Sequence, residues 1–172
     1  TRIQYEGGGD WYSDPSSIPN LLTFVSNNTN LIVNIKENRA KIGADKFYES
    51  FYLYLTGHGN INFSDTEIIE LRKFLINGGF LHADDNYGMD KSFRREMEKV
   101  FPEKEWVELP PSHPIFNIHY IFKEGLPKVH EHNNKRPQAF ALFEKGGIIV
   151  LYTFESDLGD GWEDESVHNN SK

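Results

Sequence analysis

The sequence has 172 residues, the size of one domain, and its 38% hydrophobic and 14% aromatic content is enough for a packed core. A formal net charge of −8 disfavours nucleic-acid and anionic membrane partners, and no apolar stretch reaches the roughly 20 residues that a membrane-spanning helix needs. The absence of cysteine excludes thiol catalysis, thiolate metal sites and disulfides.

The first half of the chain predicts strands that alternate with helices. A short strand is expected over residues 1–5, before the glycine-rich turn GGGDWY. A helix follows, capped by Asp14 or Ser17, and residues 31–35 form the second expected strand. The apolar run FYLYL over residues 51–55, bounded by TGHG, is typical of a strand that is covered on both faces.

The middle of the chain continues this alternation. Ser64 opens the pattern SDTE, which predicts a capping box with Glu67 at the start of an amphipathic helix. That helix is expected to end at the NGG of residues 77–79. Gly79 opens a further strand that is expected to end at Ala83, and a helix is expected over residues 89–100.

The remainder of the chain has a less regular pattern. WVEL predicts a strand, SHPIF predicts a turn, and residues 139–143 and 148–153 predict a hairpin across EKGG. The tail DLGDGWEDESVHNNSK is polar and lacks periodicity. With no internal repeat or linker, we predict a single domain over residues 1–172. A final helix would be expected to cover the sheet here, so the native chain is expected to be longer.

These elements predict an α/β fold with a mostly parallel sheet that is wrapped by helices on both faces. Ligands in such sheets bind outside the carboxyl ends of the strands. The loops GGGDWY, TGHGN, HADDNYG and ESDLGDGW meet at that edge if the final strand runs parallel to the others. The candidate ligand-binding residues in these loops are Gly8, Gly9, Asp10, Trp11, Tyr12, Asn86, Glu155, Asp157 and Trp162.

Ionisable groups in the same loops are the candidate catalytic residues, namely His58, His82, Asp84 and Asp85. Asp84 paired with Asp10 or Glu155 would supply a general acid and base, and His58 or His82 would move a proton. The alternative is structural. Asp84 or Asp85 would then cap the next helix, and His58 would hydrogen-bond a neighbouring loop.

The sequence does not identify a cofactor, and a divalent metal is the candidate. His82 with Asp84, and His130 with His132, are spaced two residues apart, so each pair would project from one side of an extended segment. Glu155 and Asp157 have the same spacing. Imidazoles and carboxylates bind zinc, manganese and non-haem iron. The alternative places the HEH segment on the solvated surface, since no fixed metal motif such as HExxH is present.

Two further motifs have plainer interpretations. The GGG run at residues 7–9 lacks both the GxGxxG spacing and a P-loop lysine, so it predicts a tight turn rather than a phosphate site. His113 precedes a proline, which holds its backbone extended and favours a turn, with a role in ligand binding as the alternative.

Several motifs carry a family resemblance. GGGDWYSDPSS, YLTGHG, NGGFLHADDNYGMD, SHPIF, GLPKVHEH and YTFESDLGDGWED resemble the bacterial family DUF4159 and, more distantly, the class I glutamine amidotransferase-like superfamily. The resemblance implies a flavodoxin-like three-layer sandwich. In amidotransferases a cysteine follows the strand that here reads GGFLHA, and this chain has none. Thiol-dependent amidotransferase activity is therefore excluded.

The GGF strand that ends in a histidine, and the HPI element of His113, also resemble the ThuA-like branch of that superfamily. This resemblance implies a carbohydrate-like ligand. Relatives with export signals or membrane-anchored neighbours imply a periplasmic or secreted location.

Together these observations predict an envelope-associated domain that binds or hydrolyses a small polar, carbohydrate-like molecule in a cleft at the carboxyl edge of the sheet. The alternative is a non-catalytic interaction domain of the bacterial cell envelope. In that case the same rim would hold a partner protein, with Trp11, Tyr87 and Trp162 as anchors.

Overall fold

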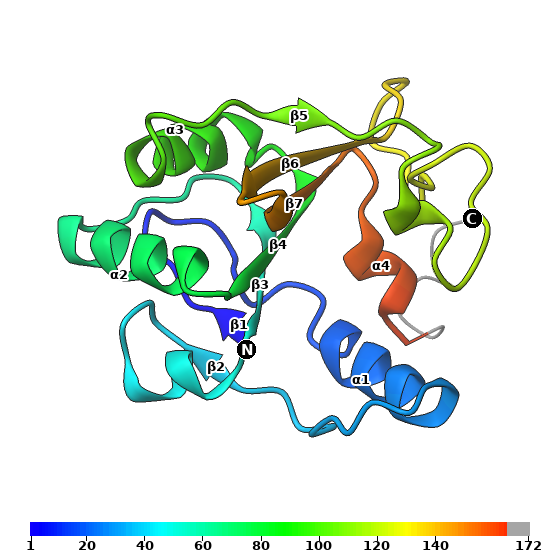
Figure 1. Ribbon diagram of the computed structural model, residues 1–172, viewed down its shortest axis with the longest axis horizontal. Helices are drawn as coiled ribbons and strands as arrows, with labels where there is room; N and C mark the ends of the chain where they lie inside the picture. The colour runs from blue at the N-terminus through cyan, green and yellow to red at the C-terminus, as the bar shows by residue number, and fades with distance from the viewer. Residues whose placement is uncertain (165–172) are drawn as a thin grey trace.

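The structure is a computed structural model, and it describes residues 1–164. One seven-stranded sheet has the strand order β2-β1-β3-β4-β7-β6-β5, with α2 and α3 on one side and α1 and α4 on the other (Figure 1). The strands are β1 (Arg2–Ile3), β2 (Arg39–Ala40), β3 (Tyr52–His58), β4 (Phe80–Tyr87), β5 (Val107–Glu108), β6 (Gln138–Glu144) and β7 (Gly147–Phe154). The helices are α1 (Ser17–Asn28), α2 (Asp65–Ile76), α3 (Asp90–Val100) and α4 (Leu158–Trp162), with 3₁₀ turns η1 (Asp45–Glu49) and η2 (Pro114–Phe116).

The predicted α/β class and mostly parallel sheet are confirmed, and the arrangement is compatible with a flavodoxin-like sandwich. β2, β1, β3, β4 and β7 run parallel, and β6 is antiparallel to β7. The segments that follow β1, β3, β4 and β7 therefore emerge at one edge. Because β6 runs the other way, the segment that precedes it also reaches this edge.

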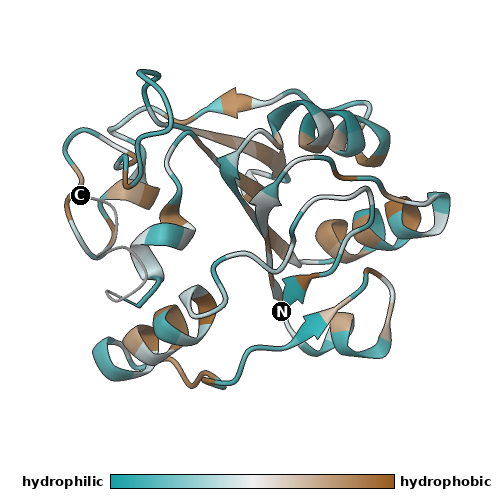
Figure 2. Cartoon of the chain, turned by 180° about the vertical axis from the view of Figure 1, so that it is seen from behind, coloured by the Kyte–Doolittle hydropathy of each residue, from teal (hydrophilic) through white to brown (hydrophobic). Residues whose placement is uncertain are grey.

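The larger hydrophobic core lies between the sheet and the helices α2 and α3. Leu53 and Leu55 of β3 are fully buried in it, together with Leu71 of α2 and Phe93 of α3. The strands of the sheet combine brown, apolar stretches with pale and teal ones in Figure 2. A smaller apolar cluster lies around Leu109.

The predicted capping box of α2 is present. The Ser64 hydroxyl accepts a hydrogen bond from Glu67 N at 3.3 Å, and the Glu67 carboxylate accepts one from Ser64 N at 2.8 Å. We expect Ser64→Ala to lower the free energy of unfolding by about 1 kcal/mol, because it removes the partner of one helix-end N–H. Urea titration measures this loss. Thr66→Ala, in the same exposed turn, is the control and should cost nothing.

Three local predictions are wrong. Residues 31–35 form no strand, because no neighbouring strand supplies a hydrogen-bonding partner, and Leu31 and Ile32 are exposed. The N-cap of α1 is Ser16, which makes no side-chain cap bond. The polar tail is helical over α4, and residues 165–172 lie outside the described part of the chain.

A distant residue takes the place of the missing cap. Glu163 Oε1 accepts hydrogen bonds from Ser16 N at 2.8 Å and from Ser17 N at 3.1 Å. Because Glu163 directly follows α4, these bonds join the end of α4 to the start of α1.

Candidate functional site

The polar HADDN segment lies within β4 rather than in a loop after it. β4 runs through to Tyr87, so the side chains of residues 82–86 alternate between the two faces of the sheet. His82, Asp84 and Asn86 face α1 and α4, while Asp85 faces α3. All four are at most 4% exposed, so they lie beneath the surface instead of forming a rim.

His82 and Asp84 belong to one buried hydrogen-bond network. The Thr153 hydroxyl donates to Asp84 Oδ1, so it is left to accept from His82 Nε2 at 3.1 Å. The other ring nitrogen of His82, Nδ1, then accepts from the Tyr52 hydroxyl at 2.9 Å. Burial lowers the pKa of His82 to about 4. His82 is therefore neutral near pH 7, with both ring nitrogens in use.

Asp84 also fixes the start of α4. Its Oδ2 accepts a hydrogen bond from Gly159 N at 2.7 Å, and Tyr54 donates to the same oxygen at 3.3 Å. Burial raises the pKa of Asp84. Trp162 covers the network, with its ring centroid 5.9 Å from that of His82.

Asp85 points to the opposite side of the sheet. Its Oδ1 accepts a hydrogen bond from Met89 N at 3.1 Å, at the N-terminus of α3, and Tyr152 donates to its Oδ2 at 3.2 Å. Burial raises the pKa of Asp85 to about 6. The N-cap of α3 is Met89 and has no side-chain cap bond, so Asp85 holds the residue before the helix and does not cap α3 itself.

Asp10 and His58 form a pair between two glycine-bearing loops. Asp10 Oδ2 lies 3.1 Å from His58 Nδ1, and Asp10 Oδ1 accepts a hydrogen bond from His58 N. A Cβ at Gly57, where φ is +131°, would lie 2.8 Å from Asp10 O, and a Cβ at Gly9 would lie 2.7 Å from His58 O. Both glycines are therefore needed for the two loops to approach. The His58 side chain stays 46% exposed.

Asp14 joins the site from the loop that precedes α1. Its Oδ2 accepts a hydrogen bond from Asn86 Nδ2 at 2.6 Å. Burial raises the pKa of Asp14 to about 6, and the nearby charges of Asp160 and Asp84 add to the shift. Asp14 therefore exchanges a proton near neutral pH.

Two histidines converge on Asp157 in the loops at the same edge. Asp157 Oδ2 lies 3.0 Å from His132 Nε2 and 3.8 Å from His130 Nδ1. His130 Nδ1 also lies 2.5 Å from Asp160 Oδ2. Burial and the charge of Asp160 raise the pKa of Asp157 to about 9.

Two groups of possible metal-ligand atoms are found among the described residues, and both include Asp157. One is His130, His132 and Asp157, and the other is Asp14, Asp157 and Asp160. In each group the atoms lie within 4.8 Å of one another. The structure thus brings together His130 and His132 of the predicted metal set, but His82 and Asp84 are in neither group.

Only one of the three pairs with two-residue spacing projects from one side of a strand, as the sequence predicts for all three. His82 and Asp84 do share one face of a strand. His130 and His132 lie outside any strand. Glu155 and Asp157 follow β7 with left-handed backbone, each with φ of +58°.

Other predicted ligand residues are more dispersed. Trp11 packs against the core, whereas Tyr12 is 59% exposed, and their rings meet edge to face at 5.5 Å. Glu155 accepts a hydrogen bond from Asn133 at 2.9 Å. His113 Nδ1 accepts one from Ile115 N at 3.3 Å in η2, which agrees with the turn interpretation. Gly8 has open space around it, and Gly9 packs against β3.

Sequence reasoning did not select Asp14 and Asp160 as site residues. The sequence indicates a helix-cap role for Asp14, and it places Asp160 in the polar segment ESDLGDGW without a role of its own. The available signal was position, since both follow strands whose carboxyl ends reach the same edge.

The protein is thus an α/β sandwich whose ionisable residues gather at the carboxyl edge of a mostly parallel sheet. A profile of DUF4159, a domain of unknown function, matches residues 1–172, and the chain belongs to this family. No curated protein matches the sequence. Among the described residues, no helix has the length and apolar character required to cross a membrane.

Proposed function

We propose that this domain binds and hydrolyses a small polar, carbohydrate-like molecule at the carboxyl edge of the sheet. The observation that carries the proposal is the contact chain across that edge. The His58 and His132 rings lie 6.4 Å apart, His132 Nε2 is 3.0 Å from Asp157, and a carboxylate oxygen of Asp157 lies within 4.8 Å of one from Asp14.

The chemistry would use one base and one acid. Asp10 orients His58 through Nδ1, which leaves Nε2 to accept a proton from water. Asp14, with its pKa raised to about 6 by burial, would protonate the leaving group. Tyr12 and Tyr87, 59% and 48% exposed, offer aromatic surface for a sugar ring.

His82, Asp84 and Asp85 would act as supports in this proposal. Asp84 holds the start of α4 through Gly159, His82 connects Asp84 to Tyr52 by way of Thr153, and Asp85 anchors α3. The resemblance to the ThuA-like branch and the amidotransferase-like superfamily supports the carbohydrate ligand. It also supports a periplasmic or secreted location.

A panel of 4-nitrophenyl glycosides and free saccharides tests the proposal by turnover and by thermal shift. We expect Asp14→Asn and His58→Ala each to lower turnover by roughly 100-fold, within the usual contribution of a general acid or base. His119→Ala, an exposed histidine elsewhere, should retain full turnover. A panel that gives neither turnover nor a thermal shift would reject the proposal.

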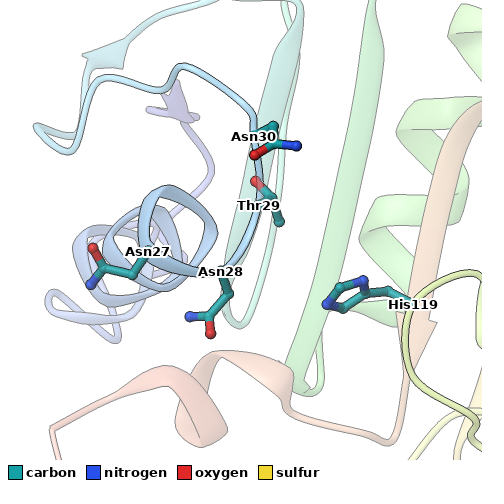
Figure 3. Close-up of a pocket in the computed structure, with 5 residues that line it drawn as sticks. All are labelled: Asn27, Asn28, Thr29, Asn30 and His119. Atoms are coloured by element: carbon teal, nitrogen blue, oxygen red, sulfur yellow. The ribbon is translucent and has the colours of Figure 1, made fainter.

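A non-catalytic interaction domain of the cell envelope is the second candidate, favoured by exposed apolar residues beside α1. Ile118 and Ile121 are 80% and 74% exposed, and the Tyr120 ring lies 6.4 Å from that of Phe24 in α1. Figure 3 shows His119 pointing toward the end of α1 across a hollow of about 470 Å³. This candidate predicts no response to any saccharide or glycoside.

A further inference from the structure

Two loops that carry His130, His132, Asp157 and Asp160 are tied together at the carboxyl edge. Val129 N donates a hydrogen bond to Ser156 O at 2.8 Å, and the Ser156 hydroxyl donates to Pro127 O at 2.5 Å. These bonds lie next to both histidines and to Asp157. The backbone therefore positions the three side chains without help from a ligand.

The distances between the side-chain atoms suit one small cation. A tetrahedral zinc ion with bonds of about 2.0–2.1 Å places its ligand atoms about 3.3 Å apart. Asp157 Oδ2 lies 3.0 Å from His132 Nε2 and 3.8 Å from His130 Nδ1, and these distances bracket that value. Asp160 Oδ2 lies 2.5 Å from His130 Nδ1, which is a hydrogen-bond distance and shorter than the separation of two zinc ligands, so Asp160 is placed beside the three ligands.

Ordinary hydrogen bonding between histidine and aspartate is the competing explanation. Hydrogen bonding would explain each histidine–aspartate contact taken alone. It does not require ring nitrogens of both His130 and His132 to lie near the same oxygen of Asp157. The His130 and His132 rings stack with centroids 4.3 Å apart and planes 28° apart, and one nitrogen of each ring lies within 4.8 Å of the other and of an Asp157 oxygen. Tyr87 stacks on His132 at 4.9 Å and completes a row of three rings.

The charge balance of the surroundings also favours a cation. Asp14 and Asp84 lie near Asp157. Within residues 1–164, no lysine or arginine makes a salt bridge with Asp14, Asp84 or Asp157, and the ion-pair partners of Asp157 are the imidazoles of His130 and His132. A divalent ion bound by these imidazoles would place positive charge next to the carboxyl groups.

We propose that His130, His132 and Asp157 form a binding site for one divalent transition-metal ion, with Asp160 beside it. Two imidazoles and a carboxylate suit zinc, manganese or ferrous iron rather than magnesium or calcium, which prefer oxygen ligands alone. The site adjoins the proposed hydrolytic cleft, and its existence can be tested without knowing the substrate.

The experiment measures metal binding by the purified chain after treatment with a chelator. Zn²⁺ titration calorimetry gives the stoichiometry and affinity, and Co²⁺ substitution gives a visible absorption band that reports the ligand geometry. We expect one ion per chain. We expect His132→Ala and Asp157→Asn each to weaken binding by more than about 100-fold, since loss of an outer-shell partner alone costs roughly 10–100-fold.

His119→Ala is the control, because His119 is an exposed histidine that lies in neither ligand group. It should bind Zn²⁺ as the parent protein does, and circular dichroism confirms that each variant is folded. The proposal fails if no stoichiometric ion binds, if His132→Ala binds normally, or if His119→Ala loses the ion. Glycoside turnover by a chain that binds no stoichiometric ion would overturn this site alone, and metal binding without any saccharide response would overturn the proposed function alone.

Discussion

Replacing Arg2 with alanine is expected to lower the free energy of unfolding by about 3–5 kcal/mol, the cost of breaking a buried charge pair. Arg2 is fully buried at the start of β1. Its Nε donates to Glu37 at 2.5 Å, and its guanidinium nitrogens donate to Ser13 O at 2.5 Å and to Asp14 O at 2.9 Å. Removal leaves these acceptors without a donor and leaves the carboxylate of Glu37, only 5% exposed, with one cation fewer.

Arg39→Ala is a close control, because Arg39 contacts the same Glu37 carboxylate at 2.8 Å but is 43% exposed. An exposed ion-pair partner of this kind contributes about 0–1 kcal/mol to the free energy of unfolding. Urea denaturation followed by circular dichroism compares the two variants. If Arg2→Ala does not fold, Arg2→Lys provides a second test, because lysine keeps the charge but lacks the planar guanidinium donors. Its free energy of unfolding should be lower than that of the parent protein, but the variant should still fold. Equal losses for the variants at positions 2 and 39 would contradict this account.

Arg2 also illustrates what the sequence could not reveal. It holds the loop that carries Asp14, so the first strand and the site are mechanically linked, yet nothing in the TRIQY pattern marks a buried arginine. The capping box at Ser64 and the β6–β7 hairpin were predictable, because each depends on neighbours in sequence. The Glu163 contact with α1 was not, because its partners lie 146 and 147 residues away.

The same distinction explains the outcome for the site. The strand directions placed the right loops together, so the carboxyl edge and His130, His132 and Asp157 could be anticipated. The burial of each residue could not be predicted from the sequence, because the length of β4 depends on its pairing with β3 as far as Tyr87. The strand continues four residues beyond its expected end at Ala83, and this places Asp84 and Asn86 inside the protein, beneath the site.

The second large effect concerns acid sensitivity, and it comes from His82. The pKa of this imidazole is lowered to about 4 by burial, whereas an unfolded chain would have a histidine pKa near 6.5. Above about pH 6.5 both states are neutral and the stabilisation is complete. As the pH falls toward 4, His82 binds a proton in the unfolded state but not in the folded state. The free energy of unfolding therefore declines by at most about 1.4 kcal/mol per pH unit. The full loss is about 3 kcal/mol.

His82→Gln isolates this contribution. A glutamine amide can donate to Thr153 and accept from Tyr52 as the imidazole does, but it does not titrate. Asp14 and Asp85, whose pKa values are raised to about 6 by burial, act in the opposite direction in both proteins, so they cancel in the difference. We therefore expect the parent protein's advantage over His82→Gln to shrink steadily between about pH 6.5 and 4. Urea titrations at each pH measure that difference, and a constant difference across this range would mean that the pKa of His82 is the same in the folded and unfolded states, which would contradict the prediction.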